Sequence, residues 1–465
     1  MTRIHLIGIG GSGLSAIARL LIEMGHTVSG SDRAESSYTR DLQAAGALIH
    51  IGHNSQNVVN ADLVVRSSAI PDDNPEVTAA RAARIPVLKR ADFLGSLMGG
   101  KTGIAVAGTH GKTTTTAMIA WMLTELHQEP SFIVGGVLND LGVNAHAGKG
   151  STFIIEADEY DRMFLGLNPA MAVVTNIEHD HPDCYPTLAD MQAAYMEFVN
   201  RLPTDGTLIA CADDPGALAL MKKAEKLGKA VLAYGLKPAD GDGRVLDIYT
   251  SVQSVNNQGG FTFGAAVLGN SATVELQVPG KHNIQNALAA LTVARLLNLP
   301  LDQASRALGR FTGTGRRFEV RGEIDGIVVI DDYAHHPTEL PATLAAARYR
   351  YPSSNIWAVW QPHTYSRTKT LLADFVNSFG NADEVIVTEV FASREPRQDF
   401  SSRQVVAAMH RPAHFIAGLP EVSKYLLSHL RSGDILLVLS AGDANQVSTD
   451  VLAGLTQRML SKGGS

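Results

Sequence analysis

The sequence is poor in cysteine and lacks long apolar runs. Cys184 and Cys211 are the only cysteines among 465 residues, which excludes a disulfide framework and a four-cysteine zinc site and suits a reducing compartment. No uninterrupted apolar stretch reaches the roughly 18 residues of a membrane helix. His5, Arg19 and Glu23 interrupt the first apolar run, where a signal peptide would be continuous. We therefore expect a cytoplasmic protein without membrane insertion.

An excess of positive charge is also absent. Lysine and arginine total 39 against 46 for aspartate and glutamate, which gives a formal net charge of -7. No electrostatic argument therefore favours a nucleic-acid partner, although a local basic site could still bind an anionic small molecule. The length of 465 residues predicts about two to four domains.

Short apolar runs alternate with helical patterns along most of the chain. HLIGI, HTVSG and IPVLK occur early, STFIIEAD, AMAVVTNI and GTLIACAD in the middle, and GIVVIDD, NIWAVWQPH and DILLVLSAG late. Such alternation is typical of α/β domains with mainly parallel sheets and flanking helices. We predict three of them, at 1–98, 99–313 and 314–465. Polar-apolar alternation over 244–279 predicts hairpins at a sheet edge.

A glycine-rich loop follows the first predicted strand. LIGIGGSG places glycines at positions 8, 10 and 13, the spacing with which a backbone approaches a pyrophosphate at a helix N-terminus. The loop predicts a Rossmann-like first domain. Taken alone, with Asp32 accepting a ribose hydroxyl, it would favour a nicotinamide-dependent dehydrogenase.

A second glycine-rich loop argues against a single dinucleotide site. AGTHGKTTTT lies between a strand pattern and a helix pattern and contains Gly108, Gly111, Lys112 and Thr113. Backbone N–H groups and the helix N-terminus can surround a polyphosphate, the lysine can neutralise its terminal oxygens, and the threonine hydroxyl can bind Mg²⁺. Val106 stands where the common P-loop pattern has glycine, so we predict a shortened P-loop.

Two acidic clusters follow later strands of the middle domain. FIIEADEYD supplies Glu156 and Asp158, and VVTNIEHDHPD supplies Glu178 and His181. The carboxyl ends of parallel strands meet at one edge of a sheet, where ligands bind in open α/β folds. Oxygen ligands dominate both clusters, which predicts Mg²⁺ in preference to Zn²⁺.

Further polar motifs lie near and beyond the middle domain. GKHNIQNALAA puts Asn283 and Asn286 on one face of a helix start, either as N-capping residues or as contacts to a nucleotide. GTGRR at 313–317 predicts a hinge whose arginines could reach phosphates. His335 and His336 in VVIDDYAHHPTE do not predict zinc, because loop neighbours rarely both bind one ion and the HExxH pattern is absent.

In this order, the motifs resemble those of the Mur ligases of peptidoglycan synthesis, and more closely those of the branch that adds L-alanine. The set comprises GIGGSGLS, GTHGKTTT, EADEYD, TNIEHDH, GKHNIQNALAA, GTGRRFE, DDYAHHPTE and QPHTYSRT. The resemblance implies a Rossmann-like N-terminal domain for a UDP-sugar, a P-loop-type central ATPase domain, and a Rossmann-like C-terminal domain that brings the amino acid.

The resemblance also implies roles for individual residues. Catalytic roles fall on Lys112, Glu156, His181, Arg317 and Asp332. ATP contacts fall on Gly108, Thr109, His110, Gly111, Lys112, Thr113, Thr114, Asn283, Asn286 and Arg317, and Mg²⁺ on Thr113, Glu156 and His181. UDP-sugar contacts fall on Gly10, Gly11, Ser12, Gly13, Asp32, Ser67, Ser68, Ala69 and Ile70, and amino-acid contacts on Tyr333, His336 and Arg367.

The implied reaction is an ATP-dependent ligation of L-alanine to the lactoyl carboxylate of UDP-N-acetylmuramate through an acyl phosphate, by a monomer or homodimer. Several family members use a carbamylated lysine in the middle domain, but no lysine lies between Lys149 and Lys222. This agrees with the alanine-adding branch, in which His181 would help to hold a second metal ion.

Three alternatives stay open. Tyr160 in EADEYD and Thr364 in QPHTYSRT depart from the alanine-adding pattern, and the tyrosine is similar to that of the ligase attaching a recycled tripeptide to UDP-N-acetylmuramate. A dehydrogenase would leave GTHGKTTT without a role. A nucleotide-dependent switch or binding protein would leave the acidic clusters and the third domain unexplained.

Overall fold

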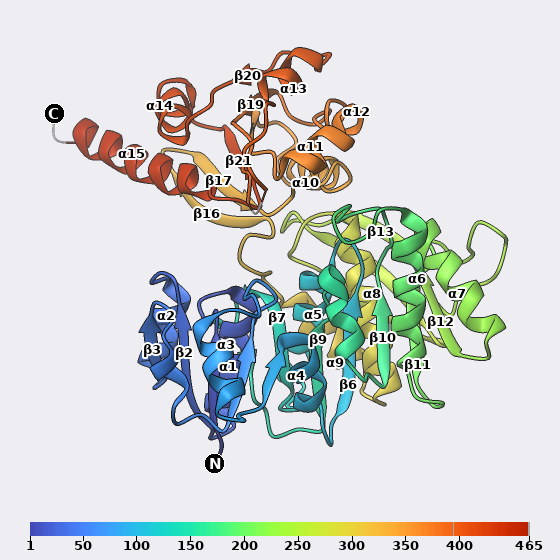
Figure 1. Cartoon of the computed structure of the whole chain (residues 1–465). Helices are drawn as coiled ribbons and strands as arrows, with labels where there is room; N and C mark the ends of the chain where they lie inside the picture. The colour runs from blue at the N-terminus through green and yellow to red at the C-terminus, as the bar shows by residue number, and fades with distance from the viewer. Residues whose placement is uncertain (394, 464–465) are drawn as a thin grey trace.

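The computed structural model describes residues 1–393 and 395–463, which form three separate sheets (Figure 1). We call the sheets with their helices the first, second and third units. Each has a mainly parallel sheet, so the predicted α/β class is confirmed. In Figure 1 the first unit lies beside the second, and the third lies above them. None of the helices in the described residues combines the length and apolar character needed to cross a membrane.

The first unit has five parallel strands in the order β3-β2-β1-β4-β5. The strands are β1 (Arg3–Ile7), β2 (Thr27–Asp32), β3 (Leu48–Ile51), β4 (Leu63–Arg66) and β5 (Val87–Lys89). The helices are α1 (Ser12–Glu23), α2 (Ser37–Ala44), η1 (Ser55–Val58), α3 (Pro75–Ala82) and α4 (Arg90–Leu97).

The second unit has ten strands in the order β15-β14-β13-β12-β11-β10-β6-β9-β7-β8. They are β6 (Thr102–Ala107), β7 (Ser131–Leu138), β8 (Val143–His146), β9 (Thr152–Glu156), β10 (Met171–Val174), β11 (Thr207–Cys211), β12 (Ala230–Gly235), β13 (Ile248–Val255), β14 (Phe261–Val267) and β15 (Asn270–Glu275). The helices are α5 (Lys112–Glu125), η2 (Tyr160–Gly166), α6 (Leu188–Asn200), α7 (Pro215–Lys226), α8 (Lys281–Leu296) and α9 (Leu301–Gly309).

The third unit has six strands in the order β16-β17-β21-β18-β19-β20. They are β16 (Glu319–Ile324), β17 (Ile327–Asp332), β18 (Ile356–Trp360), β19 (Glu384–Val387), β20 (His414–Phe415) and β21 (Ile435–Leu439). The helices are α10 (Glu339–Arg350), α11 (Tyr365–Thr370), α12 (Leu372–Phe375), α13 (Arg403–Ala408), α14 (Leu419–His429) and α15 (Asn445–Gly463).

Central strands such as β6 are buried along most of their length because helices cover both faces of their sheets. In β6, Ile104 and Val106 pack into one hydrophobic cluster, whereas Ala105 and Ala107 pack into another on the opposite face. Continuous burial of this kind distinguishes parallel strands from half-exposed antiparallel ones. The predicted edge hairpins are also confirmed, because β13, β14 and β15 pair antiparallel at one end of the sheet.

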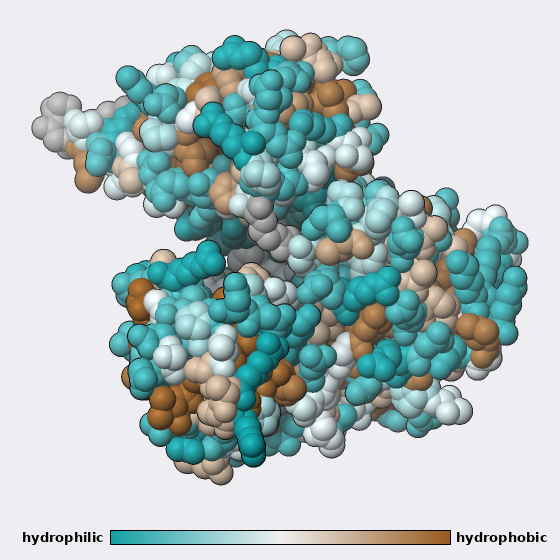
Figure 2. Space-filling view, viewed as in Figure 1, coloured by the Kyte–Doolittle hydropathy of each residue, from teal (hydrophilic) through white to brown (hydrophobic). Residues whose placement is uncertain are grey.

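The two junctions between units differ in chemistry. Leu94 and Leu97 of α4 share a hydrophobic cluster with Phe164 and Leu167 of the second unit. The third unit instead meets the second mainly through polar side chains, described below, with an aromatic contact between Phe261 and Tyr349 whose ring centroids lie 5.7 Å apart. On the face shown in Figure 2, hydrophilic residues predominate and a recess separates the first and third units.

The predicted hinge segment is tied to the second unit at its start. Asn139 N donates to Gly313 O at 3.1 Å, Gly315 N donates to Val137 O at 2.9 Å, and Thr314 forms an isolated bridge with Leu138. The segment, which follows α9, therefore lies against the end of β7 before the chain enters β16.

Candidate active site

The loop between β6 and α5 lies against the carboxyl end of β10. A Cβ atom at Gly108 would come within 1.9 Å of Thr175 Oγ1, so only glycine fits at this close approach. Thr175 Oγ1 donates to His110 O at 2.6 Å, and His110 N donates to Asn176 Oδ1 at 2.7 Å. These contacts fix the backbone ahead of the N-terminus of α5, where anions bind favourably.

Lys112 at the start of α5 faces an acidic pocket. Its Nζ lies 2.8 Å from Glu159 Oε2 and donates to Gly108 O at 2.5 Å. Burial alone would lower the pKa of Lys112, but Glu159 and Asp158 outweigh it and raise the pKa above its ordinary value. Burial likewise opposes ionisation of Glu159, yet Lys112 and His181 lower the pKa of that carboxyl. The pair is therefore an ammonium beside a carboxylate.

Two of the residues predicted to bind Mg²⁺ are in contact. Thr113 Oγ1 donates to Glu156 Oε1 at 3.0 Å, and Gly135 N donates to Glu156 Oε2 at 2.6 Å. The third such residue, His181, contacts Glu159, and its Nε2 lies 3.6 Å from Glu159 Oε1. The arrangement places a hydroxyl and a carboxylate together, whereas the imidazole contacts a different carboxylate.

The two predicted asparagines lie in one buried hydrogen-bond chain. Asn286 Nδ2 donates to Asn283 Oδ1 at 2.9 Å, and Thr115 Oγ1 donates to Asn286 Oδ1 at 3.0 Å. The N-cap of α8 is Gly280, which has no side-chain cap. The interpretation of the asparagines as capping residues is therefore wrong.

A cavity brings together predicted residues from the second and third units. Those that line it are His110, Gly111, Thr114, Asn283, Asn286, Arg317 and Asp332. Arg317 reaches residues 108–114, which we call the phosphate loop after their predicted role, with Nη2 3.4 Å from Thr113 Oγ1. Burial raises the pKa of Asp332 to about 6, although Arg317 and backbone N–H groups of Ala334 and Phe318 oppose this rise.

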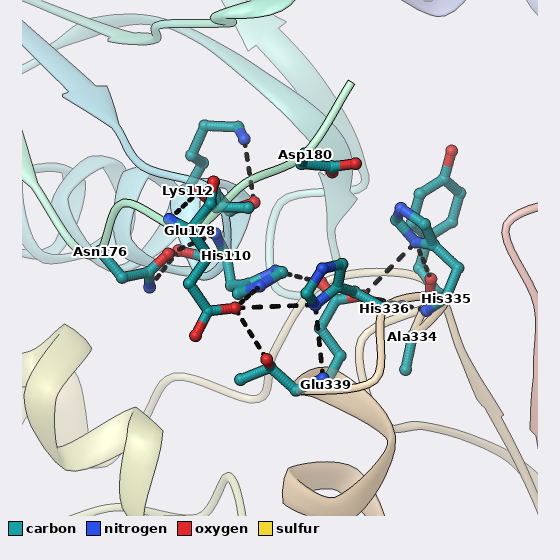
Figure 3. Close-up of polar contacts among 12 residues, drawn as sticks. His110, Lys112, Asn176, Glu178, Asp180, Ala334, His335, His336 and Glu339 are labelled. Carbon is teal, nitrogen blue, oxygen red and sulfur yellow. Dashed lines mark hydrogen bonds and ion pairs between the residues drawn. The ribbon is translucent and has the colours of Figure 1, made fainter. Parts of the chain in front are cut away.

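His110 of the phosphate loop contacts carboxylates from two units (Figure 3). Its Nε2 lies 3.0 Å from Glu178 Oε2, and its Nδ1 lies 3.1 Å from Glu339 Oε1 at the start of α10. Burial would lower the pKa of His110, but the two carboxylates raise it to about 9. Thr338 Oγ1 also donates to Glu178 Oε2, at 2.7 Å. Glu339 of the third unit thus contacts the phosphate loop directly, through the side chain of His110.

The three residues predicted to meet the amino acid lie in the same junction but in different contacts. Arg367 Nη2 donates to Asp180 Oδ1 at 2.6 Å in a buried pair, and the pKa of Asp180 falls because this attraction exceeds the effect of burial. The Arg317 guanidinium lies over the Tyr333 ring, 5.0 Å from the ring centroid. His336 is buried, and its ring centroid lies 4.8 Å from that of His110.

The first glycine-rich loop is built differently. Gly10 N donates to Asp32 Oδ2 at 2.8 Å, and a Cβ at Gly8 would lie 3.1 Å from Ser67 Cβ. The structure thus brings Asp32 and the start of the predicted Ser67–Ile70 segment to the loop. A Cβ at Gly13 would lie 1.6 Å from Arg90 Nη1, so the Arg90 guanidinium fills the space beside the N-terminus of α1.

Three family models match consecutive parts of the chain. The Mur ligase family catalytic domain matches residues 3–102, the Mur ligase middle domain 106–294, and the Mur ligase glutamate ligase domain 316–442. The chain is a Mur ligase. The matches follow the order of the three sheets.

Relatives of this Mur ligase match it over nearly its whole length. The UDP-N-acetylmuramate--L-alanine ligase of Rubrobacter xylanophilus is 44% identical over 97% of this chain and 100% of its own, and that of Salinibacter ruber is 43% identical over 95% and 92%. The crystal structure of UDP-N-acetylmuramate-alanine ligase from Thermotoga maritima superposes with a TM-score of 0.82 at 28% identity, covering 99% of this chain and 100% of the other. A murein peptide ligase from Psychrobacter arcticus, at 24% identity and a TM-score of 0.71 over 98% and 99%, shares the fold.

The Mur ligase site also contains residues that the sequence did not single out. Glu339 joins His110 from 229 positions away, and its only signal was its place at the end of DDYAHHPTE. Arg90 contacts both the first glycine loop and the second unit, where its Nε lies 2.9 Å from Met163 Sδ and its Nη2 3.6 Å from Asp158. Nothing around Arg90 in the sequence distinguishes it from an ordinary residue at a helix start.

Proposed function

We propose that this Mur ligase joins L-alanine to UDP-N-acetylmuramate in peptidoglycan synthesis, at the expense of ATP. The observation that carries the proposal is the position of Lys112, in a P-loop whose histidine is bonded to the third unit. Full-length relatives 41–44% identical bear the name UDP-N-acetylmuramate--L-alanine ligase, which supports the choice of substrates.

The chemistry explains why a phosphate loop is needed. A carboxylate resists attack by an amine because its charge repels the nucleophile and oxide is a poor leaving group. Transfer of the γ-phosphoryl group of ATP converts the lactoyl carboxylate into an acyl phosphate. The alanine amine then attacks the carbonyl carbon, and phosphate leaves from the tetrahedral intermediate to give the amide.

The chain's own residues would serve this sequence in distinct ways. Lys112 would offset the charge that spreads over the γ-phosphoryl oxygens, the main contribution that proteins make to phosphoryl transfer. Arg317, which already reaches Thr113, would add a second cation from the side of the third unit. The contacts of Glu339 and Thr338 with the second unit would exclude water, which would otherwise hydrolyse the acyl phosphate.

The three units would divide the substrates between them, with boundaries at 1–98, 99–313 and 314–465. The glycine loop of the first unit, with Asp32 and Ser67–Ile70, would bind the UDP-sugar. Asn283 and Asn286 would face the nucleotide of ATP across the cavity that they line. We assign the amino acid to the surroundings of Tyr333, His336 and Arg367.

The donor set around Thr113 fits Mg²⁺. A hydroxyl and a carboxylate lie 3.0 Å apart beside the phosphate loop, and Mg²⁺ prefers a few such oxygen ligands together with substrate phosphates. The ion would supply charge neutralisation to the phosphates when bound, and His181 would extend the set. Glu156→Ala should therefore shift the Mg²⁺ dependence of turnover to higher concentration, and Glu129→Ala, elsewhere in this unit, should not. An unchanged Mg²⁺ titration would remove Glu156 from the site.

One assay tests the proposal against its rivals. Phosphate release from ATP is followed with UDP-N-acetylmuramate plus L-alanine, L-serine, glycine or the L-Ala-D-Glu-diaminopimelate tripeptide, with NADH absorbance in parallel. We expect release that depends on both the UDP-sugar and L-alanine. Dependence on the tripeptide would indicate the recycling ligase, release without an acceptor a nucleotide-dependent switch, and an NADH signal a dehydrogenase.

A further inference from the structure

Three potential metal ligands converge at the junction of the second and third units. His110, Glu178 and His336 each present one ligand atom, and these atoms all lie within 4.8 Å of one another. His110 Nε2 lies 3.0 Å from Glu178 Oε2, and His336 Nδ1 lies 3.6 Å from the same oxygen. We call these three residues the histidine cluster. It is separate from the pair of oxygen donors on Thr113 and Glu156.

Two of the three ligands, His110 and Glu178, already have the outer hydrogen bonds that metal ligands normally require. A histidine that binds a metal through one nitrogen usually holds a carboxylate on the other, and Glu339 occupies this position on His110 Nδ1 at 3.1 Å. Thr338 Oγ1 orients the Glu178 carboxylate by donating to it at 2.7 Å. Both outer contacts come from the third unit.

His336 is the ligand with the weakest existing partners. The residue is 5% exposed, its Nε2 has no hydrogen-bond partner among the described residues, and its Nδ1 accepts only a 3.3 Å bond from Thr338 N. A buried ring nitrogen without a partner is unfavourable. An ion bound at Nε2 would remove this cost, whereas an ion bound at Nδ1, the nitrogen 3.6 Å from Glu178 Oε2, would replace only the long bond from Thr338 N.

The donor set selects the kind of ion. Two imidazole nitrogens and one carboxylate oxygen suit Zn²⁺ and its neighbours in the transition series, whereas Mg²⁺ prefers oxygen ligands alone. Three protein ligands also leave a fourth position open, as in many zinc sites. Bond lengths of about 2.0–2.2 Å require the three ligand atoms to draw closer together by side-chain rotation.

We propose that His110, Glu178 and His336 bind a zinc-type divalent cation, and that this ion fastens the third unit to the phosphate loop. His110 and Glu178 belong to the second unit and His336 to the third, so the complete ligand set exists only while the two units touch. The bound ion would oppose their separation and thereby slow turnover, because substrate entry and product release require access to the junction. The proposal does not depend on which amino acid the enzyme uses.

The direct test uses the full chain, without nucleotide, in millimolar Mg²⁺. Co²⁺ is the probe, because tetrahedral coordination by histidine and carboxylate gives intense visible absorption, and Zn²⁺ is then titrated to displace it. We expect a single Co²⁺ equivalent with a tetrahedral spectrum. Glu178→Gln and His336→Gln should each weaken Co²⁺ and Zn²⁺ binding by about tenfold or more, in line with the loss of a direct ligand.

His414→Gln is the matched control. This histidine of the third unit is exposed in β20 and lies outside the cluster, so the variant should bind Co²⁺ like the unchanged chain. Thermal unfolding of all three variants checks that they are folded. Absence of the Co²⁺ spectrum, or equal Co²⁺ affinity in the unchanged chain and both ligand variants, would overturn the proposal.

Solution scattering separates a bridging ion from one bound within the second unit alone. Zn²⁺ should reduce the radius of gyration of the unchanged chain and should not affect that of His336→Gln. Binding that persists in His336→Gln with no compaction of the unchanged chain would refute the fastening role.

Discussion

The two glycine-rich loops of this Mur ligase have similar sequences but different surroundings. Each leaves a parallel strand and begins a helix, α1 in one case and α5 in the other. The first loop is held by a carboxylate, Asp32, which accepts from Gly10 N. The second contains its own cation, Lys112, facing Glu159. Under the proposed function, glycine spacing sets how closely the backbone can approach a phosphate, whereas the charged neighbours determine what happens to that phosphate.

The largest loss of activity is expected on substitution of Lys112, the cation of the second loop. Lys112→Ala should lower alanine-dependent phosphate release by roughly 10³-fold, because a preorganised charge on the γ-phosphoryl oxygens is lost. Binding of UDP-N-acetylmuramate, measured by calorimetry, should stay close to that of the unchanged chain. The exposed Lys149 of the same unit provides the control, since Lys149→Ala should leave both quantities as they were. Near-normal turnover of Lys112→Ala would remove the second loop from the chemistry.

A smaller effect is expected at the first loop. Beside Gly13, the Arg90 guanidinium contacts the sulfur atom of Met163 and lies 3.6 Å from the carboxylate of Asp158. Its positive charge is therefore only partly neutralised. Burial lowers the pKa of Arg90, which shows the cost of that position. We expect Arg90→Gln to weaken UDP-N-acetylmuramate binding by roughly 10- to 100-fold, the value of a hydrogen bond to a charged group, and to leave ATP binding unchanged.

Arg84, exposed in the same unit, is the control for Arg90. Arg84→Gln should bind both substrates normally. If Arg90→Gln also bound the UDP-sugar normally, Arg90 would be a structural link between the units only.

The smallest effect concerns the support of the first loop. Ser31 O accepts from Gly8 N and Ile9 N, and Ser31 Oγ donates to the buried Glu76 at 2.5 Å. Burial opposes ionisation of Glu76, but hydrogen bonds from His5, Ser31 and others outweigh it and lower its pKa to about 2. Glu76→Gln should therefore reduce the free energy of unfolding by about 1–2 kcal/mol at pH 7 and weaken UDP-sugar binding only slightly.

The pH dependence provides the check. Because the folded-state pKa of Glu76 lies below the ordinary value of 4.5, its stabilising effect is complete above about pH 4.5 and declines as the pH falls toward 2. Urea unfolding should thus show a difference between Glu76→Gln and the unchanged chain that is larger at pH 7 than at pH 3.5. The exposed Glu35 serves as control, and a difference that did not change with pH would contradict the assignment.

Local patterns in the sequence were sufficient for the fold. The run IVVIDD predicted a buried parallel strand, and every residue of β17 is buried. Alternation over 244–279 predicted the antiparallel edge formed by β13, β14 and β15. These features depend on near neighbours along the chain, which a single sequence displays directly.

The site was only partly accessible in this way. Motif order led to Thr113 and Glu156, which are in contact, but no pattern related His110 to Glu339 or Arg367 to Asp180. These pairs are separated by 229 and 187 positions, and their proximity depends on how two units meet. Arg90 was missed for the same reason, because its importance lies in the space that Gly13 leaves open.

The apolar junction of α4 with the second unit bears on how the chain folds during synthesis. Leu94 and Leu97 pack with Phe164 and Leu167, so a nascent chain that has completed α4 must expose these leucines until η2 has left the ribosome. The third unit has hydrophobic clusters of its own and can form later without disturbing that junction. Chaperones and proteases would therefore compete for this protein in the interval between the synthesis of α4 and that of η2, and a translational pause there would lengthen this interval.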